Sequence, residues 1–188
     1  MHKEFDAVDY LVKKYVTDED VATIPVILKE KSEFFNRFDP TVTSLSPEIA
    51  EYLDHCAYNL PIKYKICLKI KCPDLDDKTK EGMKEALKHH YGLIVYDKNL
   101  DLRTNKIKTF VLFIIGAFIL LLAFINNNYA SSVDKIINST IDAFNEIVLV
   151  AGWVFVWSAV DNGVFEKRKL KTDKINNLQM LNADVLFE

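Results

Sequence analysis

Two long apolar blocks dominate the hydrophobic pattern of this chain. The first, FVLFIIGAFILLLAFI at residues 110–125, has sixteen residues and no charge, and the second, IVLVAGWVFVWSAV, covers residues 147–160. A helix needs about 20 apolar residues to span the hydrocarbon core of a bilayer, and the aliphatic stems of Lys106 and Lys108 can lengthen the first block. Since the core helix of a soluble protein normally keeps a polar stripe, we predict transmembrane helices at residues 106–126 and 144–165.

Two acidic residues bracket the second block. Glu146 lies 21 residues before Lys167, which corresponds to about 31 Å in a helix that rises about 1.5 Å per residue. This length matches a hydrocarbon core of about 30 Å. We therefore place Glu146 near one boundary of the membrane, Asp161 near the other, and Trp153 near the middle.

Positively charged residues flank the two blocks on one side only. They precede the first block and follow the second, as Lys98, Arg103, Lys106, Lys108, Lys167, Arg168, Lys169, Lys171 and Lys174. The intervening loop carries only Lys135. Because short loops rich in Lys and Arg stay in the cytosol, we predict cytosolic termini, with Lys167, Arg168 and Lys169 as an anchor at the inner boundary. Trp157 then belongs to the inner aromatic belt.

The external loop, at residues 127–143, also has a helical pattern. Val133 and Ile137 begin an apolar series at helical spacing, after a candidate helix cap at Ser131 or Ser132. We predict that the second helix begins near Val133 and enters the membrane near Phe144.

The rest of the sequence contains three strand candidates. Apolar and polar residues alternate along PIKYKICLKIKCP at residues 61–73, which indicates a half-buried strand. Residues 23–30 form the second candidate, in which Pro25 suggests an edge position or a strand start. The third, ADVLFE, ends the chain at residues 183–188.

Two helices are predicted in the same region. Ser46, followed by proline and an early glutamate, is a strong helix start. The second helix carries Met83, Leu87 and Tyr91 on one face, and we expect it to lead into the first transmembrane helix past a break at Gly92.

These elements define the fold class as an α+β membrane protein. It has a two-helix transmembrane hairpin plus a small cytosolic α+β domain built from both ends of the chain. We expect an N-terminal helical extension at residues 1–20, the α+β domain at 21–105, and a C-terminal segment at 166–188 that joins this domain.

Composition and motifs exclude several classes of function. The net charge of -3 argues against a dedicated nucleic-acid binder. Three cysteines without framework spacing indicate reduced thiols in a cytosolic compartment, and the charged first residues predict no secretory signal. Neither nucleotide-binding nor hydrolase or metal-site motifs occur. We therefore expect no catalytic site, no cofactor and no metal.

The second apolar block belongs to a longer ordered pattern. In chain order the pattern is Glu146, Trp153, Trp157, Asp161, Phe165 and the basic cluster Lys167, Arg168 and Lys169. Together with SEFFNRFDPTVTSLSPEIAEYLDHCAYNLP and the alternating strand upstream, it resembles a group of uncharacterised two-pass bacterial inner-membrane proteins. The resemblance covers roughly residues 23–188. It implies a two-pass protein of the bacterial inner membrane, and it implies no activity.

Small residues inside the blocks favour close helix packing, with Gly116 in the first and Gly152 in the second. We therefore hypothesise a non-enzymatic membrane module: the hairpin anchors the chain in the lipid bilayer and forms homo-oligomers, while the cytosolic domain binds a protein partner or signal. The alternative is an oligomeric pore-forming or membrane-perturbing effector in stress or phage defence, with rings of Glu146 and Asp161 that favour cations. A membrane enzyme that uses Glu146 or the histidines at 89 and 90 is the third hypothesis.

Overall fold

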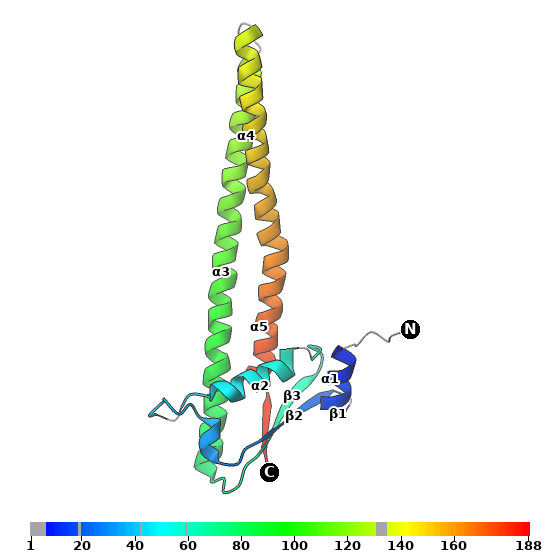
Figure 1. Ribbon diagram of the computed structural model, residues 1–188, viewed down its shortest axis with the longest axis vertical. Helices are drawn as coiled ribbons and strands as arrows, with labels where there is room; N and C mark the ends of the chain where they lie inside the picture. Colours follow the sequence, from blue (N-terminus) through cyan, green and yellow to red (C-terminus); the bar gives the residue numbers. More distant parts are fainter. Residues whose placement is uncertain (1–6, 19, 42, 59, 131–134) are drawn as a thin grey trace. The chain divides into compact units, whose positions relative to one another are not determined.

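The computed structural model describes residues 7–18, 20–41, 43–58, 60–130 and 135–188 (Figure 1). It divides into two compact units. The first consists of Met1–Lys98 together with Thr172–Glu188, and the second of Asn99–Lys171. The first unit is therefore built from both ends of the chain. Its boundaries lie a few residues away from the predicted ones at 105 and 166.

The first unit contains a four-stranded sheet in the order β1-β2-β3-β4. The strands are β1 (Val16–Asp18), β2 (Val21–Ile27), β3 (Lys65–Lys71) and β4 (Asp184–Phe187). β2, β3 and β4 run parallel, and β1 pairs antiparallel with β2. The three predicted strands are confirmed. The C-terminal strand pairs with β3.

Helices α2 (Pro47–Tyr58) and α3 (Asp77–Ala130) contribute the other layer of this unit, with residues 77–98 of α3 taking part. One hydrophobic cluster joins both helices to the sheet. The predicted apolar face of the second helix is confirmed, because Met83, Leu87 and Tyr91 are all buried. The alternation of β3 is confirmed by the buried Ile66 and Ile70, which lie on the same side of the strand.

Pro25 lies inside β2, at a point that β1 no longer covers, because β1 pairs only with the first two residues of β2. The backbone N–H of Leu28 donates to the carbonyl of Lys71 at 2.9 Å. Since successive residues of a strand face opposite neighbours, the nitrogen of Pro25 faces the open edge. There the Tyr52 hydroxyl of α2 donates to the Pro25 carbonyl at 2.8 Å. The proline therefore removes no ladder bond, although β2 is an interior strand.

Two expectations were wrong, and a third cannot be compared. The first 20 residues are not one helical extension, because α1 (Ala7–Tyr15) gives way to β1, where Val16 and Thr17 are β-branched and Val16 pairs with Ala22 of β2. α3 has no break at Gly92, since a helical glycine costs only about 1 kcal/mol relative to alanine. The cap predicted at Ser131 or Ser132 lies outside the described residues.

The second unit is a helical hairpin of α3 and α4 (Figure 1). α4 (Lys135–Asp161) continues through a π-helical turn, η2 (Asn162–Glu166), into α5 (Lys167–Leu181). Two helical stretches, Asp77–Asn126 and Asp142–Leu181, are long and apolar enough to cross a membrane, with mean hydropathies of 2.6 and 1.7 in their most apolar windows.

Candidate functional site

Gly116 of α3 faces Gly152 of α4 at a tight contact in the hairpin. A β-carbon added at Gly116 would lie 2.9 Å from Val156 Cγ2, 3.0 Å from the Val156 backbone nitrogen and 3.1 Å from the Gly152 carbonyl oxygen. One added at Gly152 would lie 2.8 Å from Leu120 Cδ2. The structure thus brings the two glycines together at a point where an added methyl group would crowd the facing helix, against backbone atoms at Gly116 and against side chains at Gly152.

A seven-residue spacing extends this contact along both helices. Gly116 and Ala123 are buried on α3, and Asn145, Gly152 and Ala159 are buried on α4. Sequence reasoning singled out Glu146 and missed its neighbour Asn145, which is only 7% exposed. The signal that could have found it is its position seven residues before Gly152, because residues a heptad apart occupy the same side of paired helices.

Glu146, Trp153, Trp157 and Asp161 do not join this contact. Trp153 is 53% and Trp157 66% exposed, and both acids are exposed as well. Their spacings of seven, four and four residues place them on one side of α4, outside the buried stripe. Near the loop end of the hairpin a cavity of about 490 Å³ is lined by Ala123, Phe124, Asp142, Asn145, Glu146 and Leu149.

A polar cluster joins the helices at the other end of the hairpin. The buried Asn105 of α3 donates from Nδ2 to the carbonyl of Asn162 at 2.9 Å. The same carbonyl accepts the backbone N–H of Lys167, the five-residue bond of the π-turn. The side chain of Asn162 donates to the Ser158 carbonyl at 2.7 Å. The carbonyl oxygen of Asn162 therefore accepts hydrogen bonds from both helices. No pattern in the sequence predicted this hydrogen-bonded cluster.

Two substitutions beside this cluster are expected to act in opposite directions. Asn105→Leu removes the interhelical donor and should cost about 1 kcal/mol. Thr109→Val should cost nothing or stabilise, because the Thr109 hydroxyl is buried without a hydrogen-bond partner. Thermal unfolding in detergent, followed by tryptophan fluorescence, checks both, because the chain's two tryptophans lie in the hairpin. If both variants lost the same stability, the hydrogen bond of Asn105 to Asn162 would not be the interaction that joins the helices.

The predicted basic anchor, Lys167, Arg168 and Lys169, lies at the start of α5 with all three side chains exposed. It directly follows the π-turn. The cationic groups therefore begin where the apolar face of the hairpin ends.

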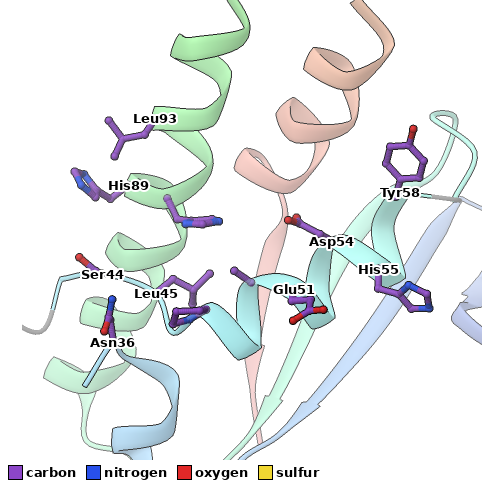
Figure 2. Close-up of a pocket in the computed structure, with 12 residues that line it drawn as sticks. Asn36, Ser44, Leu45, Glu51, Asp54, His55, Tyr58, His89 and Leu93 are labelled. Atoms are coloured by element: carbon purple, nitrogen blue, oxygen red, sulfur yellow. The ribbon is translucent and has the colours of Figure 1, made fainter. Parts of the chain in front are cut away.

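The α+β unit has a groove of about 820 Å³ beside α2 and the first part of α3 (Figure 2). It is lined by Asn36, Ser44, Leu45, Pro47, Ala50, Glu51, Asp54, His55, Tyr58, His89, His90 and Leu93. Three of the chain's four histidines are among these residues. Figure 2 shows that His55 and His89 point to opposite sides, so these imidazoles are spread apart. Among the described residues, no three His, Cys, Asp or Glu side chains are arranged to hold a metal ion.

Asp54, one of the lining residues, interacts with two side chains of α3. The hydroxyl of the buried Tyr91 donates to Asp54 Oδ1 at 3.0 Å. Burial, reinforced by the Asp54 carboxylate, raises the pKa of Tyr91 well above its usual range. Burial lowers the pKa of His90, and the Asp54 carboxylate opposes part of that shift. The groove therefore brings carboxylates and imidazoles together on one surface of the unit.

Comparison of the chain with protein-family models, curated proteins and solved structures finds no match. The resemblance based on Glu146, Trp153, Trp157 and Asp161 therefore stays a prediction.

Proposed function

We propose that the chain is a two-pass integral membrane protein whose hairpin anchors the α+β unit at the cytosolic side of the membrane. There the protein acts as a non-enzymatic scaffold or signalling module, and its α+β unit binds a partner or ligand. In a bacterium the membrane would be the inner membrane, as the sequence resemblance implies.

The exposure of the two apolar helices carries this proposal. Within the chain, only 11% of the most apolar window of α3 and 17% of that of the second helical stretch are buried. The exposed side chains include Phe110, Phe113, Phe118, Trp153 and Trp157. Each Å² of such surface costs about 25 cal/mol in water, and soluble monomers rarely expose patches above a few hundred Å². Lipid is the environment that relieves this cost on all sides of a hairpin.

The orientation follows from the charge pattern. Residues 99–108 and 161–171 contain seven Lys and Arg residues, whereas residues 127–146 contain one. By the positive-inside rule, this asymmetry supports a cytosolic location for both termini.

Alkaline extraction and cysteine labelling test the proposal. We expect the protein to stay in the membrane pellet after carbonate washing. The exposed Asn126→Cys should react with an impermeant maleimide in intact spheroplasts, and the exposed Glu85→Cys only after lysis. The wild-type chain is the control, because its three thiols are buried. Release by carbonate would refute the membrane proposal, and reversed labelling would refute only the orientation.

The exposed tryptophan face of α4 favours association of several copies. Trp153 and Trp157 present large aromatic surfaces that α3 leaves uncovered. Aromatic side chains of this kind are typical anchors of protein contacts. We infer that the module works as a homo-oligomer, and the mass of the protein in mild detergent, compared with that of Trp153→Ala, tests this.

A further inference from the structure

Seven basic residues surround one end of the hairpin. We call them the basic belt, and they are Arg103, Lys106, Lys108, Lys167, Arg168, Lys169 and Lys171. All seven side chains are exposed, and all belong to the hairpin unit. Because residues on a helix are spaced by about 100°, their side chains leave both helices in several directions. The belt is therefore a ring of charge rather than a pocket on one side.

The packing of the hairpin sets the two halves of the belt side by side. Asn105 Nδ2 donates a hydrogen bond to the carbonyl of Asn162 at 2.9 Å. A β-carbon at Gly163 would lie 3.2 Å from Thr109 Cγ2. These contacts align residues 103–109 of α3 with η2 and the start of α5. The belt thus begins on both helices at the level where the apolar blocks end.

The end of the hairpin that carries the belt has a net positive charge. Residues 99–108 and 161–171 hold seven basic and three acidic residues, so their net charge is 7 − 3 = +4. Residues 127–146, at the opposite end, hold one basic and three acidic residues, a net charge of 1 − 3 = −2. Within the described part of the chain, Lys106, Lys108, Lys167 and Lys169 form no ion pair. These lysines keep their charge available for a ligand.

We propose that the basic belt binds the phosphodiester headgroups of anionic phospholipids, so that the hairpin gathers them in the leaflet on that side. This inference rests on the proposed membrane location. The complementary ligand has to be anionic, abundant around the whole hairpin and located where its apolar surface ends. An anionic lipid of the phosphatidylglycerol class has these properties, and clustered Lys and Arg beside a membrane helix attract such lipids. Lysine suits a single phosphate, which it binds as a point charge.

Tryptophan quenching by brominated lipids tests the proposal on the full chain. The only two tryptophans, Trp153 and Trp157, lie exposed on the hairpin and report its lipid neighbours. The protein is reconstituted in phosphatidylcholine vesicles that contain brominated phosphatidylglycerol or brominated phosphatidylcholine. We expect the relative association of phosphatidylglycerol over phosphatidylcholine to be several-fold at low salt and to fall toward one at high salt, because the belt is exposed.

Two quadruple variants with the same loss of charge separate the belt from general electrostatics. Lys106, Lys108, Lys167 and Lys169 are replaced by Gln in one variant. The exposed Lys65, Lys71, Lys78 and Lys88 of the α+β unit are replaced by Gln in the other. We expect the first variant to lose most of the lipid preference and the second to keep it. Equal preference in both variants would overturn the proposal, as would a preference that inorganic phosphate at matched ionic strength abolishes.

The failure of this inference differs from the failure of the proposed function. If the chain does not enter the bilayer, brominated phosphatidylcholine will not quench either tryptophan. If brominated phosphatidylcholine quenches the tryptophans but the wild-type chain shows no preference between the two lipids, only the inference about the belt is refuted. Equal quenching of the wild type and both variants by brominated phosphatidylcholine shows that the variants enter the bilayer as the wild type does. The salt dependence of the wild-type chain tests the proposal without any variant.

Discussion

Replacement of Gly116 by alanine is expected to destabilise the hairpin by about 1–3 kcal/mol, the usual cost of overpacking a close contact. The new methyl group would lie 3.0 Å from the Val156 backbone nitrogen and 3.1 Å from the Gly152 carbonyl oxygen. Backbone atoms cannot rotate away, so the helices would have to separate. Thermal unfolding in detergent, monitored by the fluorescence of the hairpin's two tryptophans, measures the loss.

Two other glycine-to-alanine changes calibrate this prediction. Gly152→Ala should cost less than Gly116→Ala, because it meets the side chain of Leu120, which can change its rotamer. Gly92→Ala has its nearest neighbour, Leu181 Cδ1, at 3.9 Å, and it should leave the tryptophan transition unchanged. If all three variants unfolded alike, the contact at Gly116 would not be the tight point of the hairpin.

The two apolar blocks predicted the hairpin because composition alone identifies a long apolar helix. Composition does not predict which residues contact each other across the hairpin, because that depends on the register of α3 against α4. Asn105 and Asn162 are ordinary polar residues in the sequence, and only the register of the helices makes them a bonded pair. The π-turn at η2 has no periodic signal either, because it is an insertion that disturbs the helical period.

For Glu146, too, the sequence predicted the position along the helix but not the side of the helix. Distance along the helix predicted only that Glu146 lies near one membrane boundary, and it could not tell on which side of α4 the carboxylate lies. The heptad that links Asn145 to Gly152 contains that information, and it places Glu146 one position outside the buried stripe.

The α+β unit was more predictable, since each of its elements has a local pattern. The alternation of β3 and the cap before α2 are both local. β1 was missed because three residues are too few for an alternation to be recognised. Cys67 also departs from its pattern: it lies on the lysine side of β3 and is nevertheless buried, because β3 has a strand on each side and Asp184 of β4 lies opposite it.

Removal of residues 183–188 is expected to be the most damaging change to the α+β unit. It deletes β4 and with it the ladder to β3, the 2.6 Å ion pair of Lys69 with Glu188, and the packing of Val185 and Phe187 on the core. The loss of two partly buried apolar side chains and one strand pairing should cost about 3 kcal/mol. Truncation should therefore open the edge of β3 to solvent.

The thiol of Cys67 reports this opening directly. It is 8% exposed in β3, and burial, together with the nearby Asp184 carboxylate, raises its pKa. We expect the truncated chain to react with maleimide at Cys67 at least about tenfold faster, because about 1.4 kcal/mol of lost local stability raises the open population tenfold. Cys56, buried in α2 at 2% exposure, should react more slowly than Cys67 in the same sample.

Two point variants distinguish loss of the strand from loss of its charge. Asp184→Asn keeps β4 and removes only the carboxylate, so it should lower the pKa of the Cys67 thiol and raise the reaction rate far less than truncation does. Leu186→Ala changes a side chain that is 56% exposed and should have little effect. Mass spectrometry after a maleimide pulse assigns the label to each cysteine. A rate at Cys67 that truncation leaves unchanged would mean that β4 does not cover β3, and that the C-terminal segment is not part of the sheet.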